Sequence, residues 1–411
     1  MKKRNIAFIV LIIAVLLLAG GTYLLTHKPK EINVTVYAAD FNSRIIREVN
    51  KIEEGNYLIS PYSIEIALNM LRDGANGETK NQIDKLISKR EINNFKVKNR
   101  INVANAAFIK NEYKENVVKS YYTSLKEKYN ATILYDQFKT PKVMNDWVNK
   151  ETDGMIKTII NRLNPNFAMA IANAVAIDVE WRYPFECTST TKAEFTKYDN
   201  SKYDVAMMHK TYRNITYFDT DKEKGIVLPY NTYDENGKVV EDGTKLEFVG
   251  ILPNSDIKSY VNNITKDTFD RIDNNMTNLK EKEEVRLSLP MFKYEYQIKD
   301  FIKTLKDLGI KEVFDDSKAD LSNMIGKEGS NFYVSDAIHK TYIDLNEKGT
   351  KAAAVTAFFV AEKSALPEQL KTIEINFNKP FVYMIRDSKT KEVLFFGVIY
   401  EPSKWEGSTC K

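Results

Sequence analysis

The longest run of apolar residues stands at the N-terminus and fixes where the rest of the chain can fold. No charged residue occurs between Ile6 and Thr26, and about 20 apolar residues are needed to cross a bilayer as a helix. Three basic residues precede this run, and positive charge keeps its flank in the cytoplasm. We therefore expect a cytoplasmic flank at residues 1–5, an uncleaved signal-anchor at residues 6–26 and an extracellular remainder. A cleaved signal peptide is the alternative, although its apolar region usually spans only roughly 7–15 residues.

The exported part is long for a single domain but carries no sign of a boundary. Removing 26 residues from 411 leaves 385, and chains usually divide beyond about 250–300 residues. We find no internal repeat, no low-complexity block and no linker rich in Pro, Gly or Ser. The simpler interpretation is one α+β domain over residues 42–403, with a stem at residues 27–41 and a tail at residues 404–411.

Composition excludes several classes of function. The 60 basic and 56 acidic residues leave a net charge of +4, which is too balanced for a protein that binds nucleic acid. Three His without metal-ligand spacing and two Cys predict no metal site. No nucleophile elbow, zinc-protease helix, phosphate-binding loop or glycine fingerprint is present, so we predict no catalytic residue, no enzyme activity and no cofactor. Cys187 and Cys410 can pair or remain free thiols, and the sequence does not decide between these states.

Helices are predicted where apolar residues recur at helical spacing. Ser60 stands directly before Pro61, which suits the cap and first position of a helix through residues 64–71. Residues 145–160 show helical spacing, with Trp147 among the apolar side chains on one side. Residues 301–308 form an amphipathic pattern that ends at a glycine.

Strands are predicted mainly in the second half of the chain. Two apolar runs, Ile101–Ile109 and Met169–Val179, are typical of central strands that are buried on both faces. The apolar phase changes after Pro290, so we expect a bulge or bend there. The other predicted strands are Leu246–Leu252, Val285–Leu289, Tyr342–Asn346, Phe381–Ile385 and Val393–Tyr400.

One long segment does not have the composition of an ordinary loop. Roughly thirty residues separate the strand that ends near Asn346 from the strand that starts near Phe381, and unstructured loops beyond about 12–15 residues are uncommon. Residues 349–356 are small and mostly uncharged, so they could lie exposed or fit between two strands of a sheet. A helix is the alternative, because alanine is the best helix former.

These segments together resemble the serpin family of protease inhibitors, from about Asn42 to Pro402. Each matching segment alone is weak, but their order and approximate spacing are those of the family. The segments are Asn56–Gly77, Asn145–Ile160, Asn173 through Pro184-Phe185, Leu228-Pro229-Tyr230, Ala319-Asp320-Leu321-Ser322, His339-Lys340, Asn346–Thr356 and Asn378-Lys379-Pro380-Phe381.

The resemblance implies a fold of three β-sheets and eight or nine helices, with an exposed reactive loop. It also implies a monomer with a metastable native state, whose partner is a target serine protease. The protease attacks the loop as a substrate, and the cut loop then inserts as a new strand of the central sheet. Two alternatives stay open: a non-inhibitory serpin that acts as a carrier, chaperone or surface protein, and an inhibitor of cysteine proteases cut near residues 358–360.

The hinge of the loop is predicted from the same resemblance and favours an inhibitory member. Its first residues correspond to Glu347 and Gly349, and its alternating small set is Thr350, Ala352, Ala354 and Thr356, with Ala353 between them. Small uncharged side chains can be buried during insertion at little cost. We therefore expect a Thr350→Arg change to convert an inhibitor into a substrate.

The family's spacing from the hinge also predicts the reactive bond. Counted forward from Glu347, it falls between Lys363 and Ser364. A lysine before the cleaved bond suits a specificity pocket with a carboxylate at its base, so we expect a trypsin-like target. The resemblance further assigns Ser60, Ser63, Asn173 and His339 to a structural polar cluster under the sheet, and Trp181 to the point where the loop enters.

Overall fold

The computed structural model describes residues 34–87, 95–98, 100–163, 167–326, 332–350, 370–407 and 410. Its strands form four hydrogen-bonded sheets among these residues. The largest has the order β1-β18-β17-β10-β9-β8-β11, with bounds Tyr57–Ile59, Val393–Ile399, Phe381–Asp387, Leu246–Pro253, Glu223–Pro229, Thr216–Asp219 and Thr277–Asn278. A second sheet has the order β16-β12-β7-β6, with bounds Lys371–Asn376, Glu283–Pro290, Lys202–Tyr212 and Thr190–Thr196.

The other two sheets are parts of one surface. One has the order β3-β2-β4, with bounds Thr132–Asp136, Ile101–Lys110 and Met169–Ile177. The other has the order β13-β14-β15-β5, with bounds Phe292–Gln297, Lys340–Asn346, Gly349–Thr350 and Val179–Glu180. Because β4 continues into β5 through Asp178, the two sheets join at their upper end. Counted as one surface, they give the three sheets that the sequence led us to expect.

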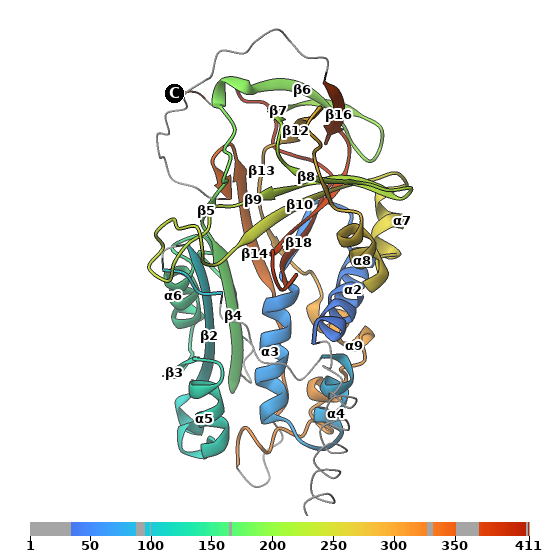
Figure 1. Ribbon diagram of the computed structural model, residues 1–411. Coiled ribbons are helices and arrows are strands. Elements are labelled where there is room, and N and C mark those ends of the chain that lie inside the picture. The colour runs from blue at the N-terminus through green and yellow to red at the C-terminus, as the bar shows by residue number, and fades with distance from the viewer. Residues whose placement is uncertain are drawn as a thin grey trace, which may run out of the picture.

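Eight α-helices occur in the described part of the chain. Helix α3 packs against β4 and β18, α6 against β2, and α2 against α7 and α8 (Figure 1). Their bounds are Val34–Ile52 (α2), Pro61–Gly74 (α3), Gly77–Leu86 (α4), Lys119–Glu127 (α5), Lys142–Glu151 (α6), Ile257–Asn262 (α7), Lys266–Asn274 (α8) and Phe301–Asp307 (α9). Short 3-10 turns lie at Asn111–Asn116 (η1), Cys187–Ser189 (η2) and Glu312–Phe314 (η3).

The predicted start of helix α3 is confirmed. The hydroxyl of Ser60 accepts a hydrogen bond from the backbone N–H of Ser63 at 3.1 Å, and Pro61 is the first helical residue. The bend at Pro290 is confirmed as well. Strand β12 ends at Pro290 in one sheet, and β13 starts at Phe292 in another.

Two expectations from the sequence need correction. The helix expected over residues 145–160 ends at Glu151, because Asp153 and Gly154 adopt positive φ angles of 49° and 75° that reverse the chain. The side chain of Asn145 then accepts hydrogen bonds from the backbone of Ile159 and Ile160. The run Met169–Val179 is not a central strand along its length, because β4 pairs only with β2 among the described residues.

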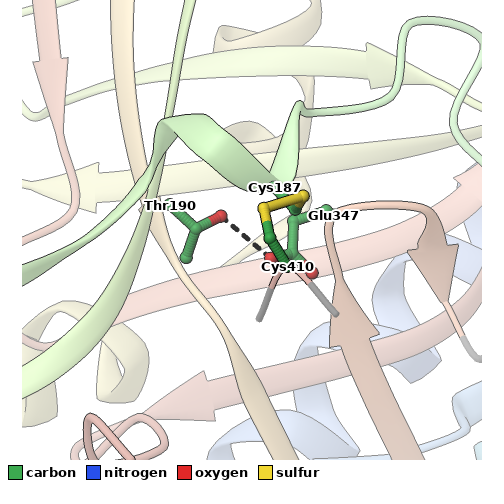
Figure 2. Close-up of a disulfide and its surroundings, with 4 residues drawn as sticks. All are labelled: Cys187, Thr190, Glu347 and Cys410. Carbon is green, nitrogen blue, oxygen red and sulfur yellow. Dashed lines mark hydrogen bonds between the residues drawn. A yellow bond between two sulfur atoms is a disulfide. The ribbon is translucent and has the colours of Figure 1, made fainter. Parts of the chain in front are cut away.

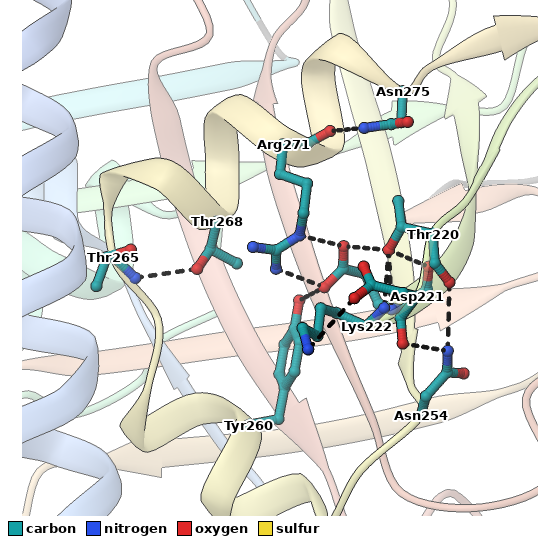
Figure 3. Close-up of polar contacts among 10 residues, drawn as sticks. Thr220, Asp221, Lys222, Asn254, Tyr260, Thr265, Thr268, Arg271 and Asn275 are labelled. Carbon is teal, nitrogen blue, oxygen red and sulfur yellow. Dashed lines mark hydrogen bonds and ion pairs between the residues drawn. The ribbon is translucent and has the colours of Figure 1, made fainter.

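A buried carboxylate joins the large sheet to helices α7 and α8. Glu223, at the start of β9, is fully buried and accepts hydrogen bonds from Arg271 Nε and Nη2 at 3.0 and 2.8 Å. The hydroxyls of Tyr260 and Thr220 add bonds of 3.0 and 2.8 Å to the same carboxylate (Figure 3). Every acceptor position of this buried charge is therefore occupied, which is the condition for burying it.

Candidate functional site

The chain turns back on itself at the end of β14, and the first two residues of the segment that the sequence singles out enter the sheet as β15. Strand β15 pairs with β14 on one side, through Leu345–Thr350 and Asn346–Gly349. It pairs with β5 on the other side, where Thr350 lies opposite Val179. Thr350 is only 2% exposed. The first residues of the predicted hinge are thus already a strand between two others.

Close packing at this point requires a glycine. A Cβ atom at Gly349 would lie 2.1 Å from the backbone oxygen of Val179, which is far inside van der Waals contact. The backbone φ angle of Gly349 is 154°, a value that side chains rarely allow. The sequence prediction that Gly349 belongs to the hinge therefore coincides with a position where only glycine fits.

Two aromatic side chains fasten the hinge to the rest of the molecule. Trp181 donates its backbone N–H to Lys348 O at 2.8 Å and its indole N–H to Asn346 O at 2.9 Å. Its ring stacks on Tyr230 with centroids 4.5 Å apart, and the Tyr230 hydroxyl lies 2.7 Å from Thr350 Oγ1. Burial raises the pKa of Tyr230, so the hydroxyl keeps its proton and can share it with Thr350.

Glu347 is held by the segment that follows β5. Its backbone oxygen accepts from Phe185 N at 2.9 Å, and its carboxylate accepts from the Thr190 hydroxyl at 2.9 Å. Between these two residues, Cys187 forms a disulfide with Cys410 (Figure 2). The choice that the sequence left open between free and paired thiols is settled in favour of the pair.

Beneath the hinge, polar side chains link α3 to strands on both sides. The backbone N–H of Ser60 donates to His339 Nε2 at 3.0 Å, just before β14. The Ser63 hydroxyl donates to the side-chain oxygen of Asn173 in β4. The amide of Asn173 donates to Asn105 in β2 at 2.6 Å. The structure therefore brings Ser60, Ser63, Asn173 and His339 together on one helix start.

His339 is uncharged at neutral pH. Burial lowers the pKa of His339 to about 3, and its side chain is only 6% exposed. Because Nε2 accepts the hydrogen bond from Ser60, the ring proton is assigned to Nδ1. A neutral acceptor at this position joins the strand that begins at Lys340 to the cap of α3.

An apolar cavity of about 150 Å³ lies beside the lower part of β4. Helix α3, β4 and the segment 332–339 each contribute to its walls. The segment 332–339 is not in a strand, and it leads directly into β14. Below β15, no strand of the described residues lies between β4 and the segment 332–339. Side chains line the space between them. Its lining includes Ala67, Leu68, Met144, Phe167, Ile171, Phe301, Val334 and Ile338.

Comparison with known proteins identifies this architecture. The family model described as serpin (serine protease inhibitor) matches residues 37–402. The chain belongs to the serpin family. Among curated serpins, the leukocyte elastase inhibitor of Xenopus tropicalis is 28% identical over 398 residues, which cover 90% of this chain and all of the relative.

Solved serpin structures confirm the predicted α+β fold. Tengpin, a thermophilic serpin, is 31% identical in its native state, with a TM-score of 0.74 over 91% of this chain and 95% of tengpin. Its latent state is 28% identical, with a TM-score of 0.71 over 92% of this chain and all of the tengpin chain.

Several features predicted from the sequence lie outside the described residues. These are the signal-anchor at residues 6–26, the hinge residues Ala352, Ala353, Ala354 and Thr356, and the reactive bond Lys363–Ser364. Within the described residues, no helix has the length and apolar character that crossing a membrane requires. The same residues contain no group of three or more His, Cys, Asp or Glu that could hold a metal ion.

Sequence reasoning assigned no role to several residues that hold the site. Phe185 and Thr190 contact Glu347 through a backbone N–H and a hydroxyl, and Asn105 accepts from the amide of Asn173 in the polar cluster. Phe185 and Tyr230 were parts of matching segments but received no role. For Thr350, the structure changes the expected effect of an arginine substitution. Thr350 is buried in the uncut chain, so an arginine there would disturb the native state as well as insertion.

Proposed function

We propose that this serpin is an extracellular suicide-substrate inhibitor of a trypsin-like serine protease, held at the membrane by its N-terminal segment. The observation that carries the proposal is the position of Thr350. It is buried between β14 and β5, at the upper end of a space that continues downward beside β4. The residues that follow Thr350 can therefore continue the strand that Gly349 and Thr350 begin.

The pairing register supports insertion of that segment. Gly349 lies opposite Glu180 and Thr350 opposite Val179. An antiparallel strand that continues this register places Ala352 opposite Ile177 and Ala354 opposite Val175. Directly opposed residues on neighbouring strands point to the same face of a sheet, and Val175 and Ile177 of β4 are part of the largest cluster of buried apolar side chains. Small side chains are thus expected where the neighbouring residues are already large and buried.

Strand β4 also offers an unused edge. It pairs with β2 on one side, and none of the described strands below β5 pairs with its other side. A free strand edge is a template for a new strand, because its N–H and C=O groups gain partners. Insertion of the loop after cleavage would supply those partners along the nine residues Met169–Ile177.

Cleavage is the step that releases the loop. The serine hydroxyl of the protease attacks the carbonyl carbon of Lys363 and loses its proton to the protease histidine. The bond to the Ser364 nitrogen breaks, and that nitrogen leaves as an amine that takes the proton. An ester then joins the protease to Lys363. Insertion of residues 351–363 competes with hydrolysis of this ester, and the protease is trapped when insertion is faster.

Mixing the full chain in detergent with trypsin tests the proposal. We expect a covalent complex that survives denaturing electrophoresis and a released peptide that begins at Ser364. Ala354→Glu should be cleaved at the same rate but yield little complex, because a charged side chain must be buried beside Val175. Glutamate adds the charge without adding a site that trypsin cuts. Ala365→Glu is the matched control, since the same side chain follows the cleaved bond and does not enter the sheet.

Three results would contradict the proposal in different ways. Cleavage of the parent chain without complex would indicate a non-inhibitory serpin. Cleavage near residues 358–360 by a cysteine protease, with trapping, would assign the other class of target. Equal trapping by the parent and Ala354→Glu would show that residue 354 is not buried during the reaction.

A further inference from the structure

The C-terminal tail is fastened by a covalent bond to the segment that holds the hinge residue Glu347. Cys187 and Cys410 are 223 residues apart in sequence, and their Cα atoms are 5.3 Å apart. The disulfide lies beside the Thr190–Glu347 hydrogen bond, at the end of β14 (Figure 2). Both cysteines are only half-buried, so a small reductant can reach the sulfur atoms.

Residues 185–190 close the upper end of the space beside β4. We call these residues and their hydrogen bonds to Glu347 the clamp. Phe185 and Thr190 stand on either side of Cys187, and both bind Glu347. This segment follows β5, whereas Glu347 directly follows the last residue of β14. The two hydrogen bonds therefore join the two sides between which the loop must enter. Loop insertion requires these sides to move relative to each other.

The tail is anchored independently at its other end. Ser403 N donates to Met291 O at 3.0 Å, and Trp405 N donates to Asp204 O at 3.0 Å. Lys404 forms an isolated antiparallel β-bridge with Val205, so residues 403–405 lie against the backbone of β7. Beyond this anchor, Glu406 and Gly407 are exposed. Residues 403–405 are thus fixed beside β7, and the disulfide fixes Cys410 at the clamp.

We propose that the disulfide makes the tail a strap that keeps the clamp closed and that reduction releases. A dithiol reductant transfers two electrons and two protons to the bond, becomes a disulfide itself and leaves Cys187 and Cys410 as thiols. The clamp then rests on its hydrogen bonds alone. The intact, uncut loop inserts more often, and active inhibitor is lost to an inserted form comparable to a latent state. This inference rests on the insertion step of the proposed function.

Hydrogen exchange of the full chain tests the strap without any protease. The amides of Trp181 and Phe185 donate across the clamp, so their exchange reports its opening. We expect both to exchange about tenfold faster after reduction and alkylation, the change that accompanies about 1.4 kcal/mol. The amide of Ile226, in the large sheet, is the internal reference and should not change. Equal exchange of the clamp amides in both redox states would overturn the proposal.

Conversion of the uncut chain is the second measurement. At raised temperature, the reduced chain should become resistant to urea unfolding and to loop cleavage several times faster than the oxidised chain. Cys410→Ser and Cys187→Ser should match the reduced parent and show no response to the reductant. Faster exchange with an unchanged conversion rate would also overturn the proposal. Failure to trap a protease would instead refute the proposed function and leave the exchange comparison as it stands.

Discussion

Protonation of His339 should make the native state lose stability as the pH falls. Burial lowers the pKa of His339 to about 3, whereas the same side chain in an unfolded chain titrates near 6.5. Above about pH 6.5 both states are neutral, and the group contributes no pH dependence. Below it the unfolded state binds a proton that the native state does not, so stability falls with pH. At 1.36 kcal/mol per pH unit, the loss from about pH 7.5 to about pH 5 is ~2 kcal/mol.

Urea unfolding of the full chain at the two pH values, followed through its first transition, measures this loss. Glutamine at position 339 does not titrate, and its side-chain oxygen can accept the bond from Ser60 N. The parent should lose ~2 kcal/mol more between the two pH values than His339→Gln does. His209→Gln alters a half-buried histidine in β7, on another sheet, and should keep most of the parent's response. Identical losses for the parent and His339→Gln would refute the reasoning, because His339 would then titrate alike in both states.

Two further predictions concern stability away from and at the hinge. Glu223→Gln leaves Arg271 without its buried carboxylate, so we expect the free energy of unfolding in urea to fall by roughly 3 kcal/mol. A loss below about 1 kcal/mol would show that the ion pair stabilises little. Gly349→Ala places a Cβ against Val179 O, so β15 should leave the sheet while the fold survives. Hydrogen exchange would then show the amide of Trp181 exchanging at least about tenfold faster, and an unchanged rate would mean that the backbone tolerates the added carbon.

Features set by neighbouring residues were predictable from the sequence. The cap of α3 depends on Ser60 and Pro61, which are adjacent, and the structure confirms it. The bend at Pro290 followed from a change of apolar phase within a few residues. The helix over residues 145–160 was predicted too long, although Asp153-Gly154 is a turn signal inside the pattern. The prediction gave more weight to the helical spacing than to this turn signal. In the structure the turn ends the helix at Glu151.

Features that join distant parts of the chain were not predictable in the same way. The bond from Thr190 to Glu347 joins residues 157 positions apart in sequence, and the bond from Phe185 is of similar range. A backbone donor or a threonine hydroxyl has no distinctive pattern in the sequence. The pairing of Cys187 with Cys410 depends on where the tail lies after folding. Only the resemblance to serpins placed Asn173 and His339 in one cluster, because their hydrogen bonds to α3 are long-range.

The buried position of Thr350 changes where the proposed inhibitory step would begin. The sequence argument treated Thr350 as a residue that is buried when the loop inserts, but it is enclosed by β14, β5 and Tyr230 before any cleavage. An arginine at position 350 would therefore act on the uncut protein, and a loss of inhibition would not separate a damaged hinge from blocked insertion. In the proposed function, the residues beyond 350 enter the sheet after cleavage. Under that proposal a charge at position 354 acts on the inserted state, which makes it the sharper probe of the mechanism.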